Sequence, residues 1–156
     1  MDDPATIEAL MARALAQAEA AARRGEVPVG AVLAGADGTV IAEDGNRIVE
    51  RVDPTAHAEI LVIRAAARAL NSERLVGSVL VSSLEPCAMC AGAIAHARIA
   101  RIIYGADDPK GGAVGHGPRF FEQPTCHHRP LVVKGPGAEE SAILLKAFFR
   151  ARRAGA

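Results

Sequence analysis

The sequence predicts an α/β protein in which helices flank a mixed five-stranded sheet on both faces, giving three α/β/α layers. Two observations support this prediction. Short apolar runs typical of buried strands alternate along most of the chain with longer segments whose apolar residues recur at helical spacing. The chain has 156 residues, half of them hydrophobic, which suits one compact domain over residues 1–156 with a substantial core.

The first part of the chain predicts a helix followed by a hairpin. Apolar residues recur at helical spacing from residue 7 to residue 18, and Gly25 gives a stop signal after two arginines. Two short apolar runs follow at 27–34 and 39–42. The sequence GADG at 35–38 lies between them and predicts a hairpin turn.

The rest of the chain alternates helix and strand. Thr55 is a candidate N-cap for a long apolar helix, and Pro86 suits the first position of the next one. The predicted elements are helices at 56–70, 87–97 and 139–153, and strands at 78–83, 99–104 and 131–134. The apolar residues that the last helix is expected to bury are Ile143, Leu144, Ala147 and Phe148.

The composition limits the classes of protein that fit the chain. No apolar run approaches the length of a membrane span, and the first residues lack the features of a secretory signal. The formal net charge is zero, which counts against a strongly electrostatic, nonspecific nucleic-acid binder. Three cysteines, two of them three positions apart, favour metal ligation in a reducing compartment over disulfides. We therefore expect a cytoplasmic protein.

The segment 107–130 departs from the alternation of helices and strands. It is long, rich in Gly and Pro, and carries three of the five histidines. Long irregular connections in compact domains are usually either functional or disordered. We expect this one to form a lip over a substrate.

Two short strings contain the residues that could carry chemistry. One is HAE at 57–59, and the other is PCAMC at 86–90, in which Cys87 and Cys90 share one helix face. The helices that contain the strings flank one predicted strand in the sequence. Both must run antiparallel to that strand, so both begin at the same edge of the sheet. His57, Cys87 and Cys90 then converge where open α/β sheets bind their ligands.

One His and two Cys give three protein ligands. The number of protein ligands distinguishes catalytic from structural zinc sites. A catalytic site keeps one position for water, whereas a structural site closes with four protein ligands. The candidates for a fourth ligand are His96, His116, Cys126, His127 and His128. A redox role for the two cysteines would leave His57 and Glu59 without purpose. In the catalytic interpretation, Glu59 is no ligand but takes a proton from the metal-bound water and passes it to the substrate.

The residues around the two strings resemble the cytidine and nucleobase deaminase superfamily, and within it the bacterial tRNA-specific adenosine deaminases. The similar stretches are GEVPVGAVL at 25–33, GNR at 45–47, DPTAHAEI at 53–60, LEPCAMCAGAI, HARI and YGADDPKGGAVG between 84 and 115, and FFRARR at 148–153. The resemblance covers nearly the whole chain. It implies a cytidine-deaminase-like fold and one zinc ion per subunit, held by His57, Cys87 and Cys90, with Glu59 as proton shuttle.

The resemblance also implies a substrate and the residues that bind it. The reaction would hydrolyse the wobble adenosine of a tRNA anticodon to inosine. Asn46 would hydrogen-bond the flipped purine, and the backbone amide of Ala58 would help to orient it. Family members are homodimers in which the partner subunit helps to form the RNA-binding surface. The other implied contacts are Val27, Pro28 and Val29 in the pocket, and Lys110 and Arg150–Arg153 near RNA phosphates; the arginines fit a solvated helix end equally well.

Departures from the family pattern keep alternatives open. Ser83, His116 and the stretch 119–130 differ from the usual residues of the family. The main alternative is a free nucleobase or nucleoside deaminase of the guanine or cytosine type, because those enzymes share both strings. The scarcity of aromatic residues and the Gly-rich segment after Tyr104 favour an open site for RNA. A non-catalytic zinc module is an alternative of another class, and Glu59 would be dispensable in it.

Overall fold

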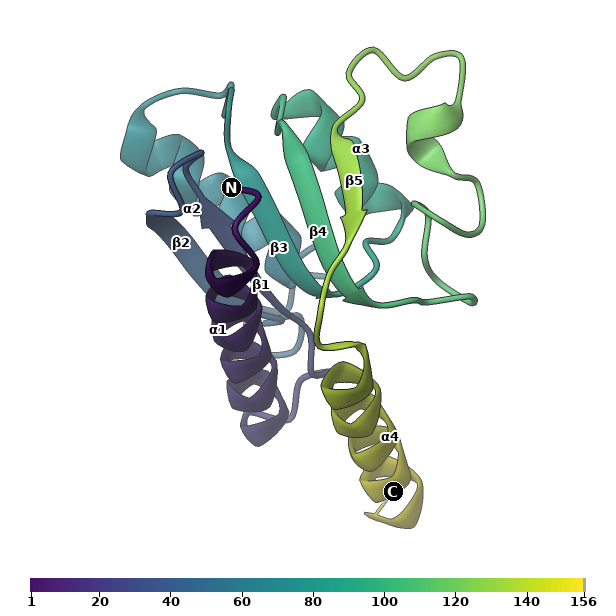
Figure 1. Cartoon of the computed structure of the whole chain (residues 1–156). Helices are drawn as coiled ribbons and strands as arrows, with labels where there is room; N and C mark the ends of the chain where they lie inside the picture. Colours follow the sequence, from purple (N-terminus) through teal and green to yellow (C-terminus); the bar gives the residue numbers. More distant parts are fainter. Residues whose placement is uncertain (156) are drawn as a thin grey trace.

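The computed structural model describes residues 1–155, and five strands in this part of the chain form one mixed sheet (Figure 1). The elements in chain order are α1 (Pro4–Arg23), β1 (Gly30–Ala34), β2 (Val40–Gly45), α2 (Ala58–Leu70), β3 (Val79–Leu84), α3 (Ala88–His96), β4 (Arg101–Ala106), the 3₁₀ turn η1 (Phe120–Glu122), β5 (Leu131–Lys134) and α4 (Ala138–Gly155). The sheet order is β2-β1-β3-β4-β5. Strand β1 pairs antiparallel with β2 and β3, whereas β3, β4 and β5 are parallel.

Side chains alternate between the two faces of the sheet, and each face is buried under helices. The face toward α1 packs Leu10, Met11 and Ala14 against Val32, Val81 and Ile103. The opposite face packs residues of α2 and α3, among them Val62, Ala66 and Ile94, against Leu33, Leu80 and Ile102. Because successive residues of a strand point to opposite faces, one strand can fill both cores. The predicted three-layer α/β/α fold with a mixed five-stranded sheet is confirmed.

Helix α1 lies unusually close to β1, and Gly30 makes this possible. A Cβ atom at Gly30 would overlap the carbonyl oxygen of Ala14 and would lie 2.6 Å from the nitrogen of Ala18. Both of these atoms belong to the helix backbone, which cannot move aside as a flexible side chain could. The backbone of α1 therefore packs directly on the first residue of β1.

The two helices that carry the HAE and PCAMC strings begin slightly later than the sequence suggests. His57 is the N-cap of α2, and Cys87 is the N-cap of α3. The expectation that Thr55 caps the first of these helices is wrong. The hydroxyl of Thr55 instead donates to the Asp53 carboxylate at 2.7 Å, within the turn before the helix. Both N-cap residues have extended backbone, which turns their side chains away from the helix axis toward the space between the two helices.

Helix α4 is less buried than its apolar residues suggest. Ile143 is 58% exposed, Ala147 is exposed, and Leu144 and Phe148 are only half-buried. The helix starts at the carboxyl edge of the sheet and projects beyond it, so that most of its length has no sheet to cover (Figure 1). The prediction that α4 buries these residues is therefore wrong for Ile143 and Ala147, and only partly met by Leu144 and Phe148. Within residues 1–155, no helix combines the length and the hydropathy that a membrane span needs.

Candidate functional site

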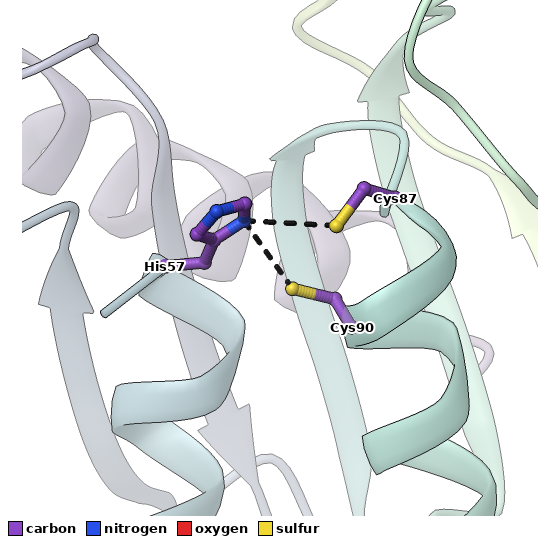
Figure 2. Close-up of side chains that lie close together, drawn as sticks. All are labelled: His57, Cys87 and Cys90. Carbon is purple, nitrogen blue, oxygen red and sulfur yellow. Dashed lines mark hydrogen bonds between the residues drawn. The ribbon is translucent and has the colours of Figure 1, made fainter. Parts of the chain in front are cut away.

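The N-terminal ends of α2 and α3 lie side by side at the carboxyl end of β3, and three side chains point toward one another there. The Nδ1 atom of His57 lies 3.6 Å from the Sγ atom of Cys87 and 3.6 Å from that of Cys90 (Figure 2). His57 and Cys87 are half-buried, and Cys90 is buried. This arrangement follows from the topology, because both helices run antiparallel to the strand between them.

The geometry of the three side chains fits a tetrahedral metal ion. Zinc lies about 2.0–2.1 Å from an imidazole nitrogen and about 2.3 Å from a thiolate sulfur, so a tetrahedral angle separates the two ligand atoms by about 3.6 Å. The two measured nitrogen–sulfur distances are 3.6 Å each. One imidazole and two thiols are also a donor set that zinc favours. Both nitrogen–sulfur separations therefore match those expected around a zinc ion, and the three ligand atoms lie within 4.8 Å of one another.

The described part of the chain offers no fourth protein ligand to this cluster. The group of nearby His, Cys, Asp and Glu side chains at this place consists of His57, Cys87 and Cys90. Two of the candidates for a fourth ligand have other partners: the thiol of Cys126 donates to the carbonyl oxygen of His128, and Nε2 of His128 lies 2.7 Å from the carbonyl oxygen of Ile99. A three-ligand site leaves one coordination position for water or substrate, as catalytic zinc sites do.

The pKa values of the two thiols shift in opposite directions. A hydrogen bond from the Cys90 thiol, together with one from His57, lowers the pKa of Cys87 to about 4. The same hydrogen bond to Cys87, together with burial, raises the pKa of Cys90. The hydrogen bond to Cys87 also raises the pKa of His57. A divalent cation would stabilise the second thiolate and neutral His57, because metal ligands bind in their deprotonated forms.

Glu59 lies two residues after His57 and lines the same cavity without belonging to the ligand group. Its side chain is 4% exposed. Burial raises the pKa of the Glu59 carboxyl, because loss of water disfavours the charged form. A carboxyl group with a raised pKa is suited to accept and return protons near neutral pH.

A cavity of about 290 Å³ lies beside the cluster. Sites for small molecules span about 300–1,000 Å³, so this cavity lies at the small end of that range and suits a compact ligand. The residues that line it are Val27, Val29, Asn46, Ile48, His57, Glu59, Leu84, Glu85, Cys87, Asp108 and Gly111. Apolar walls with a few polar groups are the ordinary composition of a binding pocket.

Asn46 ties together two sides of the cavity. Its Oδ1 atom accepts the backbone N–H of Ala58 at 2.8 Å, and its Nδ2 group donates to the carbonyl oxygen of Val27 at 3.1 Å. The side chain is 5% exposed. The amide of Ala58, which we expected to orient the substrate, is already bonded to Asn46 in this structure. Asn46 thus links the start of α2, next to His57, to the wall formed by Val27.

The other residues expected at the site lie at different depths. Val27 and Val29 line the cavity, whereas Pro28 between them is buried and does not line it. Lys110 is exposed on the segment that borders the cavity. The four residues Arg150–Arg153 are exposed on α4, and the Arg152 guanidinium donates to the carbonyl oxygen of Gly25 at 2.7 Å.

Sequence reasoning missed several residues that line the cavity: Ile48, Leu84, Glu85, Asp108 and Gly111. Two of them, Asp108 and Gly111, belong to the expected substrate lip 107–130. The sequence therefore indicated the segment but not these individual residues. The later part of that lip does not line the cavity; Phe120 in η1 packs near Gly92 of α3 instead. Glu85 also had a signal, since it lies two positions before Cys87.

Comparison with known proteins agrees with this site. Residues 4–106 match the family described as the cytidine and deoxycytidylate deaminase zinc-binding region. The chain is 59% identical to the tRNA-specific adenosine deaminase of Agrobacterium fabrum over 92% of its own length and 93% of the relative's. A solved structure from work on A-to-I editing by tRNA:A34 deaminases superposes with a TM-score of 0.86 at 58% identity, covering 88% of this chain and 99% of that one. A guanine deaminase structure from Bacillus subtilis superposes with a TM-score of 0.63 at 31% identity, covering 94% and 93%.

The fold and the three-ligand cluster define the class of protein, and the chain belongs to the cytidine and deoxycytidylate deaminase family. Within this family, its place is with the tRNA-specific adenosine deaminases, as its identity to that group over nearly the full length of both chains shows.

Proposed function

We propose that residues 1–156 form one deaminase domain that hydrolyses the wobble adenosine of a tRNA anticodon to inosine. One observation carries the proposal: a three-ligand metal cluster and a buried carboxyl group line one base-sized cavity, in a chain 59% identical to a tRNA-specific adenosine deaminase. Hydrolysis replaces the amino group at C6 of adenine with oxygen from water and releases ammonia.

His57, Cys87 and Cys90 would hold one zinc ion per chain. When bound there, zinc would lower the pKa of a bound water molecule, so that this water could lose a proton and act as a nucleophile at neutral pH. Glu59 takes a proton from the attacking water and passes it to a ring nitrogen of the purine; it then moves the second proton of the same oxygen to the amine, which leaves as ammonia. Its burial supports this role, because the raised pKa lets the same carboxyl group act as base and then as acid.

RNA is favoured over a free base as the substrate. Within residues 1–155, no Phe, Tyr or Trp side chain lines the cavity to close over a small ligand. The chain is also 58% identical to a chain from the work on tRNA:A34 deaminases, compared with 31% for the guanine deaminase. Asn46 would contact the base, and Lys110 and the exposed arginines of α4 would contact phosphates, since α4 projects beyond the carboxyl edge of the sheet (Figure 1).

Two further properties remain predictions. A homodimer would complete the RNA-binding surface, and light scattering on the purified protein measures the mass that decides this. A cytoplasmic location would bring the enzyme to its tRNA, and fractionation of the cells that make it would show this.

The test compares substrates at equal concentration. Purified protein is incubated with an anticodon stem-loop that carries adenosine at the wobble position, and in parallel with free guanine, cytosine and adenosine. Mass spectrometry should find inosine in the stem-loop and little product from the free compounds. A matched stem-loop with adenosine moved one position away from the wobble site is the control. Deamination of guanine or cytosine without action on the stem-loop would refute the proposal.

A further inference from the structure

A second buried carboxylate lies beside the cluster of His57, Cys87 and Cys90, and it has no role in the proposed proton transfers. Glu85 is 2% exposed and lies two residues before Cys87. Its Oε1 atom accepts the amide N–H of Asp108 at 3.0 Å and lies 2.7 Å from Nδ1 of His116. Its Oε2 atom accepts the amide N–H groups of Val114, Gly115 and His116 at 3.0–3.1 Å.

The donors come from one segment, residues 108–116. Three consecutive amides point at a single oxygen, an arrangement of backbone N–H groups that binds anions. The segment has nine residues, and Pro109 has no N–H, so eight amides need acceptors. Four of these eight donate to Glu85. The segment contains no helix or strand whose carbonyl groups could accept hydrogen bonds from these amides. The Glu85 carboxylate accepts them instead.

Gly112 shows how closely the segment surrounds this carboxylate. A Cβ atom at Gly112 would overlap the carboxyl group of Glu85 and would lie 2.6 Å from the carbonyl oxygen of Asp108. Only glycine fits at this position while the carboxylate stays in place. The amide of Ala113 also donates to the carbonyl oxygen of Pro86 at 2.9 Å, which ties the segment to the residue just before Cys87.

A second metal site does not explain Glu85. Its carboxylate, Asp107 and His116 lie close enough together to suggest one. The two oxygens of a carboxylate offer about four lone-pair sites, and five donors already occupy those of Glu85. The amide hydrogens that point at these oxygens would repel a cation. The negative charge of Glu85 therefore serves to bind the amide groups of segment 108–116 and not a cation.

The same segment forms one wall of the cavity, because Asp108 and Gly111 line it together with Glu85. We propose that Glu85 is a positioning residue that holds segment 108–116 in place as the wall facing the substrate RNA. The inference rests on the proposed function for the identity of the substrate. Glu85 does not take part in the chemistry. It keeps segment 108–116 ordered before RNA binds, so RNA binding does not have to supply the free energy of ordering this wall.

The test uses Glu85→Gln in the full-length, zinc-loaded protein. The amide of Gln has one oxygen and one NH2 group, so whichever way it turns, at least two donors of the segment face another donor. Hydrogen exchange of the peptide that covers 108–116 should accelerate. The KM for the anticodon stem-loop should rise about tenfold, the equivalent of one hydrogen bond to a charged group. The kcat and the zinc content should stay within about twofold, because the metal ligands and Glu59 are unchanged.

Two further variants keep the result interpretable. Leu75→Val weakens the core at the opposite end of β3, where Leu75 is 1% exposed, and should leave exchange at 108–116 and the KM unchanged. His116→Ala removes a partly exposed donor and retains the four amide bonds, so it should raise exchange and KM in the same direction but less. If Glu85→Gln does not fold, His116→Ala decides the question.

Three results would overturn the inference: unchanged exchange at 108–116, a loss confined to kcat, or a loss of zinc. Failure of the proposed function has a different signature. In that case the wild-type protein does not deaminate the stem-loop, while the exchange comparison still reports whether Glu85 holds the segment.

Discussion

Removal of the Asn46 side chain should weaken both the fold and the site. In Asn46→Ala, the amide of Ala58 loses its acceptor, and Ala58 is 0% exposed, so water does not easily replace the lost bond. A buried amide left without a partner costs about 1–3 kcal/mol. For a chain of this size, each kcal/mol lowers the melting temperature by roughly 2–4 °C. We therefore expect a loss of about 1–3 kcal/mol in the free energy of unfolding.

Urea unfolding followed by circular dichroism measures this loss. Asn46→Asp is compared with Asn46→Ala: both variants lose the N–H that donates to Val27, but Asp keeps an oxygen that can accept the Ala58 amide at the N-terminus of α2. A negative charge is also favoured at that end of a helix. The Asp variant should therefore unfold at a higher urea concentration than the Ala variant. Equal stability of Asn46→Ala and the wild type, within about 0.5 kcal/mol, would show that the reasoning about the buried amide is wrong.

Three other predictions concern the proton shuttle, the metal and the packing of α1. Glu59→Gln should lower kcat on the stem-loop by at least about a hundredfold with unchanged zinc content, because general acid–base catalysis contributes 10²–10⁴; single-turnover kinetics and elemental analysis measure both. Cys90→Ser should reduce bound zinc well below one ion per chain, because the hydroxyl of Ser does not ionise to replace a thiolate ligand; elemental analysis after dialysis against a weak chelator measures it. Gly30→Ala should lower the free energy of unfolding by about 1–3 kcal/mol or more, because its Cβ overlaps the backbone of α1; urea unfolding measures it.

Gly92→Ala is the control for the packing prediction. A Cβ atom there would lie 3.7 Å from the ring of Phe120, an ordinary contact, within helix α3. Exchange of Gly for Ala in a helix stabilises by about 0.4–1 kcal/mol, so the two variants should shift stability in opposite directions. A destabilised Gly92→Ala would contradict the packing argument. For the other two variants, retained activity in Glu59→Gln or retained zinc in Cys90→Ser would contradict the assigned roles.

The alternation of helical and strand-like patterns was enough to predict the layers of the fold. The strands at 78–83 and 131–134 and the helix at 56–70 agree with β3, β5 and α2 to within two residues at each end. The burial of α4 could not be predicted in the same way. Its sequence contains the apolar residues of a packed helix, but burial depends on whether a neighbour is present, and α4 extends past the sheet (Figure 1).

The positions of His57, Cys87 and Cys90 followed from topology, because short connections force the two helices to begin at one edge. That argument uses only residue types and the order of elements. The N-cap of α2 could not be derived so directly. Thr55 is a good capping residue by type, but its hydroxyl donates to the Asp53 carboxylate instead. Which of two local partners a hydroxyl binds depends on distances that a sequence pattern does not contain.

Asn46 and Glu85 show the limit of inference from residue types most clearly. Their partners are main-chain groups that lie 12–31 residues away in the chain, at Ala58, Val27 and segment 108–116. Every residue except proline has an amide N–H, so no pattern of side chains marks which amides will meet a given carboxylate. A buried acidic residue beside a metal ligand therefore suggests catalysis or a second metal in a sequence, and only the direction of the surrounding N–H groups assigns Glu85 to the backbone of the pocket wall.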